Sequence, residues 1–311
     1  MIDSGAHAAP HDTLLHVADL HFWHVTWNPF RMLNKRVLGN ANVFLRRRHQ
    51  YAMERADHFV NALHAVGPRQ LLFTGDFSST SLDEEFKRAR AFVDAVAGRG
   101  FAIQILPGNH DLYTFESLRQ RRFEHYFAPY MPGDGYPAQH TLPGGTPLIL
   151  VQTACPNLVS SRGRVTPHQL EWVEGLIDEV PDPVIVAGHY PLLTSTTAYE
   201  MSYERRLRGA EPLRQLLGRS GKRILYVAGH VHRFSYVVDP EFPNLRHLCT
   251  GTFFGHNKRE NLDGEFSEIH VGPDGFDVYR HTYDTTWHKL PAPCDLNHAN
   301  SGANMVASPH A

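Results

Sequence analysis

Side chains that commonly bind metal ions follow five short apolar segments of the sequence. They are Asp19, His21, Asp76, Asn109, His110, Asp111, His189, His230 and His232. Carboxylate, imidazole and amide groups together suit divalent transition metals, and one carboxylate can bridge two ions. Two ions about 4 Å apart can clamp a phosphoryl group and generate hydroxide near neutral pH. The alternative interpretation is that these are ordinary hydrogen-bonded polar residues at the rim of a sheet. That interpretation would suit a single histidine, but it suits the complete set of nine residues less well.

The apolar segments before these residues predict buried strands. They cover residues 14–21, 71–76, 101–111, 183–189 and 223–230, and residues 148–154 form a similar segment. Their lengths, β-branched residues and Gly or Pro boundaries are typical of buried strands. Because ligands in α/β sheets collect at the carboxyl ends of strands, the metal-type side chains should meet at one edge. A glycine directly precedes several of them and allows the chain to turn sharply there.

Helical patterns lie between these strands. They span residues 50–66, 82–98, 116–127, 166–180 and 209–218. The fourth opens with Thr166 as N-cap, Pro167 at the first helical position and Gln169 three residues on, a capping box. Strand patterns follow at residues 234–239, 246–254 and 266–280, the last interrupted by a Pro-Asp-Gly turn. We therefore expect an α/β fold in which sheets and helices pack in layers.

The pattern indicates one domain over residues 1–288 with an aromatic and basic insertion at residues 22–49. Residues 289–311 are small and polar, which predicts a disordered tail. A net charge of −2 gives no support for nucleic-acid binding. The three cysteines show no pairing pattern, and no leader-like or membrane-spanning segment is evident. We expect a cytoplasmic protein, and the composition leaves its oligomeric state open.

The order D-x-H, G-D, G-N-H-D, G-H and G-H-x-H resembles the calcineurin-like metallophosphoesterase superfamily. Here the five blocks read DLH, GD, GNHD, GH and GHVH, and they run from residue 19 to residue 232. The resemblance implies a four-layer α/β/β/α sandwich with two divalent ions, commonly Mn, Fe or Zn. It assigns one ion to Asp19, His21, Asp76 and His232. It assigns the other to Asp76, Asn109, His189 and His230, so that Asp76 bridges.

The same resemblance implies a mechanism for cleaving a phosphodiester or pyrophosphate bond. His110 matches the family residue that contacts phosphate and protonates the leaving oxygen, and Asp111 is expected to orient its imidazole. The nucleophile would be a hydroxide bridging the metals, so no covalent intermediate is expected. The protein is accordingly predicted to be a metallophosphoesterase with a phosphate-ester substrate.

The segment from Leu20 to Met53 contains no Asp or Glu, but has six cations among many aromatic and aliphatic residues. We expect substrate contacts from this segment and from a later loop, through Trp23, Trp27, Phe30, Arg46, Arg47 and Tyr190. Such a mixture suits lipid headgroups or an anionic amphiphile, with peripheral contact at the inner face of the membrane. The alternative is an insertion that packs its apolar residues onto the domain and leaves its cations solvated.

A narrower resemblance concerns the substrate. The stretches PFRMLNKRVLGNANVFLRRR, GNHDLYTFESLRQRRFEHYF and GHYPLL are similar to the chlamydial-type UDP-2,3-diacylglucosamine pyrophosphatases of lipid A synthesis. Those enzymes release UMP and a lipid phosphate from a doubly acylated nucleotide sugar, which would require an apolar groove. A soluble phosphodiesterase for cyclic nucleotides or small diesters is the second hypothesis. A catalytically idle binding scaffold is the third, and the intact ligand set with His110 argues against it.

Overall fold

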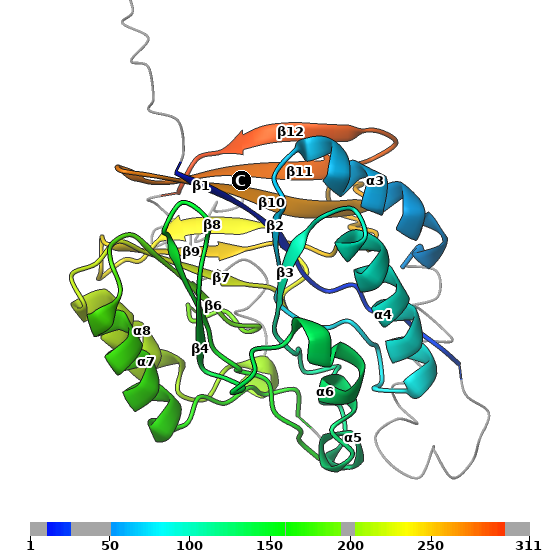
Figure 1. The fold of residues 1–311 in the computed structure, drawn as a ribbon, viewed down its shortest axis with the longest axis horizontal. Helices are drawn as coiled ribbons and strands as arrows, with labels where there is room; N and C mark the ends of the chain where they lie inside the picture. The colour runs from blue at the N-terminus through cyan, green and yellow to red at the C-terminus, as the bar shows by residue number, and fades with distance from the viewer. Residues whose placement is uncertain (1–10, 26–50, 159, 194–202, 296–311) are drawn as a thin grey trace, which may run out of the picture.

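A computed structural model describes residues 11–25, 51–158, 160–193 and 203–295. In this part of the chain two sheets face each other, and helices cover both outer faces (Figure 1). The first sheet contains, in spatial order, β12 (Trp287–Ala292), β11 (Gly275–Tyr283), β10 (Gly264–Gly272), β1 (Asp12–Val17), β2 (Gln70–Phe73) and β3 (Ala102–Ile105). The second contains β4 (Ala138–Thr141), β5 (Pro147–Leu150), β6 (Val184–Ala187), β7 (Ile224–Ala228), β9 (Leu245–Cys249) and β8 (Ser235–Val238). The predicted four-layer arrangement is confirmed.

Parallel pairing explains how distant parts of the sequence reach one place. In the first sheet β1, β2 and β3 are parallel, and in the second β5, β6, β7 and β9 are parallel. The carboxyl ends of each parallel set therefore lie at one edge of their sheet. All five segments that were predicted to deliver metal-type side chains belong to these two sets.

Four helices flank the sheets as their apolar patterns predict, and the predicted helix over residues 116–127 is divided into two. They are α3 (Ala56–Val66) and α4 (Asp83–Ala97) on the first sheet, and α7 (Pro167–Glu179) and α8 (Ala210–Arg219) on the second, with α5 (Phe115–Arg119) and α6 (Arg122–Phe127) at one end (Figure 1). The break after α5 falls at Arg121, whose φ of 48° ends the right-handed helix. Short 3₁₀ turns occupy Met53–Arg55, Ala128–Tyr130 and Tyr203–Arg205. The capping box of α7 is present, with Gln169 N donating to Thr166 Oγ1.

Because successive side chains of a strand point to opposite faces of the sheet, the central strands contribute to two separate parts of the core. Leu14 and Leu72 belong to the cluster between the sheets, together with Leu225 and Val227 of the facing sheet. Their sequence neighbours, such as Leu15, pack instead with residues of α3 and α4. Both faces of the central strands are thus buried, which accounts for their continuous apolar sequences.

The predicted tail begins too early. Residues 287–292 form β12 and pair with β11, and Trp287 packs against Phe59 and Tyr283. This edge strand is mostly exposed and contains Pro291. Proline is compatible with an edge strand, but in a sequence it argues against a strand, so β12 could not be recognised there. Residues 296–311 and most of the predicted insertion, residues 26–49, lie outside the described residues. Within the described ranges, none of the helices combines the length and apolarity needed to cross a bilayer.

Replacement of Gly75 by alanine tests the close backbone approach between the ends of β2 and β3. Gly75 has a φ of 99°, and a Cβ there would lie 2.3 Å from the backbone N of Gly108. Gly100 is a matched control, because its φ is 86° but a Cβ would meet no atom within 4 Å. We expect Gly75→Ala to lower the free energy of unfolding by about 1–3 kcal/mol more than Gly100→Ala, as steric overpacking adds to backbone strain. Urea denaturation followed by circular dichroism measures both, and equal losses would contradict the role assigned to this contact.

Candidate metal centre

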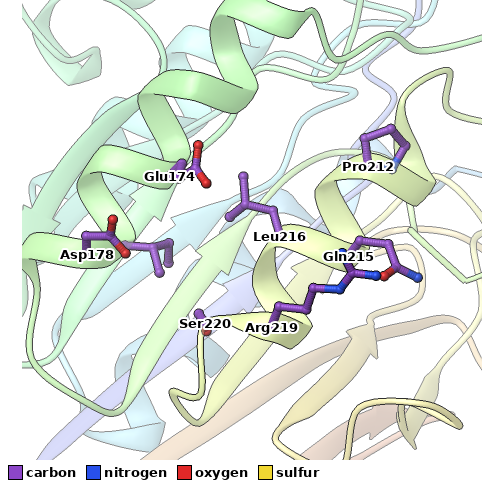
Figure 2. Close-up of a pocket in the computed structure, with 8 residues that line it drawn as sticks. Glu174, Asp178, Pro212, Gln215, Leu216, Arg219 and Ser220 are labelled. Carbon is purple, nitrogen blue, oxygen red and sulfur yellow. The ribbon is translucent and has the colours of Figure 1, made fainter.

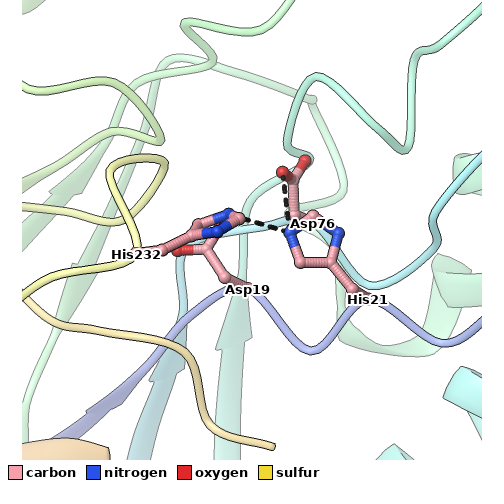
Figure 3. A group of neighbouring side chains, drawn as sticks. All are labelled: Asp19, His21, Asp76 and His232. Carbon is pink, nitrogen blue, oxygen red and sulfur yellow. Dashed lines mark hydrogen bonds and ion pairs between the residues drawn. The ribbon is translucent and has the colours of Figure 1, made fainter. Parts of the chain in front are cut away.

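The first group of metal-type side chains joins the ends of β1, β2 and β7. Ligand atoms of Asp19, His21, Asp76 and His232 all lie within 4.8 Å of one another (Figure 3). His21 Nε2 lies 3.6 Å from Asp76 Oδ2 and 2.9 Å from His232 Nε2. Two buried carboxylates and two imidazoles that converge in this way fit a divalent transition metal.

The second group lies on the other side of Asp76. Asp76 Oδ1 is 3.5 Å from His189 Nε2, whereas Asp76 Oδ2 faces His21. Asn109 Oδ1 lies 3.1 Å from His189 Nε2 and 3.0 Å from His230 Nδ1. The two oxygens of Asp76 therefore face two different donor groups, which is the arrangement that a bridging carboxylate requires.

Five of these residues adopt left-handed backbone conformations. The φ angles are 56° at Asp19, 50° at His21, 58° at Asp76, 69° at His230 and 58° at His232. Such angles cost about 1–2 kcal/mol per non-glycine residue and persist only where neighbouring structure holds them. Hydrogen bonds between the strand ends do so here, since Asp19 N donates to Gly75 O and His21 N donates to Asp76 O.

Main-chain carbonyl groups determine which nitrogen of two histidines faces the site. His189 Nδ1 donates to Thr74 O at 2.7 Å, and His230 Nε2 donates to Arg205 O at 3.1 Å. Carbonyl oxygens only accept, so His189 Nε2 and His230 Nδ1 remain available to bind a metal. Burial lowers the pKa of His189 to about 4 and that of His230 well below its ordinary value. Both imidazoles are therefore neutral, as metal ligation demands.

Tyr51 performs the corresponding role for His232. The tyrosine hydroxyl lies 3.3 Å from His232 Nδ1, on the side of the ring opposite the ligand nitrogen. Its ring also packs edge-on against His21, with centroids 4.9 Å apart. Tyr51 is buried, and its backbone is held by a bridge to Gly255. The sequence patterns do not predict Tyr51, Thr74 or Arg205 as partners of these histidines, and only Thr74 is adjacent to a predicted motif.

The role predicted for Asp111 is wrong. Its oxygens accept hydrogen bonds from the backbone N–H groups of Phe77, Ser78 and Gly108. Asp111 therefore holds the loops after β2 and β3 together and does not orient His110. Burial, followed by the charge of Asp76, raises the pKa of Asp111 to about 7. The Ser79 carbonyl orients His110 instead, because His110 Nδ1 donates to it at 2.7 Å. Predicting this partner would have required the path of the loop after β2.

Glu85 holds the loop that orients His110. It is fully buried, and its carboxylate accepts from the backbone N–H groups of Ser79, Thr80, Leu82 and His24. Burial raises the pKa of Glu85 to about 7, although these hydrogen bonds oppose the shift. One carboxylate thus links the start of α4, the Ser79 loop and the chain just after His21.

The residues predicted to contact substrate divide into three cases. Trp23 is half-buried beside the first group, and its Nε1 donates to Tyr51 O, so its substrate contact stays a prediction. Tyr190 is fully buried, and its hydroxyl donates to Ser161 O. Its ring packs on that of His230, with centroids 4.1 Å apart. Tyr190 thus packs on His230 and offers no exposed surface, which corrects the prediction that it contacts the substrate. Trp27, Phe30, Arg46 and Arg47 lie outside the described residues.

Removal of the Tyr51 hydroxyl tests its influence on metal binding. We expect Tyr51→Phe to weaken the binding of one of the two Mn²⁺ ions about 10–100-fold, because partners of metal-ligating histidines orient the ring. Isothermal titration of the metal-free protein with Mn²⁺ measures this. Tyr236→Phe is the control, since Tyr236 is also buried and donates its hydroxyl to Phe276 O between the sheets. Unchanged affinity for both ions in Tyr51→Phe would contradict the assignment.

Comparison with known proteins agrees with this geometry. The family model of the calcineurin-like phosphoesterases matches residues 13–234, a range that contains both groups. A dimetal phosphatase from Danio rerio is similar in structure, with a TM-score of 0.61 and 13% identity over 91% of this chain and 99% of its own. Purple acid phosphatase PPD1 from yellow lupin (Lupinus luteus) has a TM-score of 0.58 and 13% identity over 91% of this chain and 54% of its own. This chain therefore spans about half the length of the lupin protein.

At these identities the structural likeness supports the fold alone. No functionally curated protein matches the chain, and the comparisons do not support the narrower resemblance to UDP-2,3-diacylglucosamine pyrophosphatases. The family match nevertheless covers most of the sequence, and the paired groups fit two divalent metal ions. The chain belongs to the calcineurin-like phosphoesterase family, whose members' activity makes it a hydrolase of phosphoester bonds.

Proposed function

We propose that this protein cleaves a phosphodiester or pyrophosphate bond at a centre formed by the two groups of donors. These seven residues are Asp19, His21, Asp76, Asn109, His189, His230 and His232. The observation that carries the proposal is the position of Asp76, whose two oxygens face separate groups of donors. Two divalent cations bound there would act as Lewis acids on the phosphoryl group and lower the pKa of water. The buried carboxylates of Asp19 and Asp76 would offset the positive charge of the ions.

His110 is the proton donor in this proposal. Its backbone N–H donates to Asp76 Oδ1, which fixes its Cα beside the bridging carboxylate. Its Nδ1 donates to the Ser79 carbonyl, and Tyr113 stacks on its ring with centroids 5.4 Å apart. A carbonyl acceptor on Nδ1 stabilises the imidazolium, whose second proton at Nε2 can pass to the leaving oxygen. A binding scaffold would have no use for a proton donor held in this way.

For the substrate we propose UDP-2,3-diacylglucosamine, cleaved to UMP and a lipid phosphate, with contact at the inner face of the membrane. The aromatic and cationic composition of residues 22–49 supports this choice. The described residues Trp23 and Tyr51, on either side of residues 24–50, lie near His232, because Trp23 Nε1 donates to the Tyr51 carbonyl and the Tyr51 hydroxyl contacts His232. A soluble diesterase for cyclic nucleotides or small diesters is the alternative, and it would not need the segment.

Substitution of His110 distinguishes proton donation from metal binding. We expect His110→Ala to slow cleavage of a dinucleotide, whose alkoxide leaving group needs a proton, by about 10²–10⁴-fold. Cleavage of the p-nitrophenyl ester of thymidine 5′-phosphate should be slowed much less, because p-nitrophenolate leaves without protonation. Metal content, measured by elemental mass spectrometry, should match that of the unsubstituted protein. Asp76→Asn should instead lose metal and both activities. Equal slowing of the two substrates by His110→Ala would refute its role as an acid.

The acylated substrate requires a separate test. We expect Trp27→Ser and Phe30→Ser to lower kcat/KM for UDP-2,3-diacylglucosamine about 10–100-fold, since each removes an aromatic side chain that we propose to contact the acyl chains. UDP-N-acetylglucosamine has the same diphosphate without the acyl chains, and its turnover should change far less. Trp172→Ser on α7 is the control, because Trp172 is 53% exposed and belongs to the helix layer on the second sheet. Equal losses on both nucleotide sugars, or no UMP detected by mass spectrometry, would exclude this substrate.

A further inference from the structure

Two loops beside the metal-type residues carry a strong positive charge. We call residues 160–165 and 203–209 the arginine loops. They contain Arg162, Arg164, Arg205, Arg206 and Arg208, and a single acidic residue, Glu204. Because the whole chain has a net charge of −2, this concentration of cations is a local feature of one surface.

Backbone hydrogen bonds join the arginine loops into one unit. Ser161 N donates to Glu204 O at 3.0 Å, Arg208 N donates to Gly163 O at 3.0 Å, and Val165 N donates to Arg208 O at 2.8 Å. Gly163 lies so close to the Tyr190 ring that a Cβ there would approach it to 2.6 Å. The loops are therefore fixed against the buried side of the second metal group.

The same loops contact two residues of that group. Arg205 O accepts from His230 Nε2, and Ser161 O accepts from the hydroxyl of Tyr190, which packs on His230. After burial and the neighbouring histidines, the charge of Arg205 also helps lower the pKa of His230. The charge of Arg205 consequently acts on the second group, beside which a phosphoryl group would be bound.

Several of these arginines have no anionic partner within the described residues. No carboxylate there lies within 4.0 Å of the guanidinium nitrogens of Arg162, Arg164, Arg205 or Arg208. Elsewhere the fold does pair its arginines, as with Arg214 and Asp239 at 2.6 Å. Arg162 is pre-oriented over the Tyr203 ring at 4.2 Å, and Arg208 Nη2 donates to the neutral Asn157 amide.

We propose that the arginine loops form a second anion site that binds a phosphate of the substrate other than the one cleaved. The proposal rests on the proposed function, since it concerns the substrate of the same centre. Guanidinium groups bind phosphate through paired, charge-assisted hydrogen bonds, and their planar shape suits such recognition. The geometry thus favours substrates with at least two phosphoryl groups, such as nucleoside diphosphate derivatives, over simple diesters.

Two substrates with the same scissile bond test this inference. They are the p-nitrophenyl esters of thymidine 5′-phosphate with and without a 3′-phosphate. We expect the protein to have a higher kcat/KM for the ester with the 3′-phosphate than for the ester without it. Arg205→Gln should reduce the ratio of these two kcat/KM values about tenfold, because a charge-assisted hydrogen bond to the 3′-phosphate is lost. Arg99→Gln is the control, since this exposed arginine precedes the amino end of β3, away from the ligand-bearing strand ends. An unchanged ratio in Arg205→Gln, or no preference in the unsubstituted protein, would overturn the proposal.

A binding measurement separates this inference from the proposed function. If neither ester is hydrolysed, the proposed function fails, and titration of the metal-free protein with thymidine 3′,5′-bisphosphate then decides on the anion site. Binding that is about tenfold weaker in Arg205→Gln than in Arg99→Gln would support the site. Equal affinities in the two variants would refute it.

Discussion

The contact between Gly75 and Gly108 sets the positions of the metal-type side chains. A side chain at either glycine would overlap the other strand end, and at Gly108 it would also reach Asp76 Oδ1 at 2.1 Å. At this contact Asp76 lies between His21 and His189, and each of its two oxygens faces one of these histidines. The hydrogen bond from His110 N to Asp76 Oδ1 depends on the same approach. The backbone contact between Gly75 and Gly108 therefore positions both the donor groups around Asp76 and the proton donor His110.

This arrangement concentrates negative charge in the interior. Asp19, Asp76 and Asp111 are all buried, and the charge of Asp76 contributes to the raised pKa of Asp111. Burying carboxylates near one another is unfavourable unless cations compensate for them. Divalent ions would supply that compensation, so metal binding should stabilise the folded state as well as enable chemistry. The left-handed residues at the strand ends add a further cost that the same ions would help to offset.

Much of this structure could be predicted from the sequence, for identifiable reasons. Buried parallel strands have continuous apolar sequences, and their ends carry polar residues in recognisable motifs, so the sequence predicts the seven donor residues that the structure brings together. The partners of those residues were not found, since Tyr51 and Arg205 reach their histidines through tertiary folding without a local pattern. Asp111 was misassigned because adjacency to His110 in sequence does not determine which way a buried carboxylate points. The sequence does not predict the edge strand β12, because none of its residues is buried and it therefore has no apolar pattern.

The hydrogen bond between Trp23 Nε1 and Tyr51 O has an evolutionary consequence. It joins Trp23 and Tyr51, which lie just before and just after residues 24–50, so this segment begins and ends at two neighbouring positions of the fold. A segment whose ends are already fixed together can change in length or composition at little entropic cost to the rest of the protein. Related chains could exchange this part, and with it the compounds they accept, while inheriting the hydrolytic centre intact.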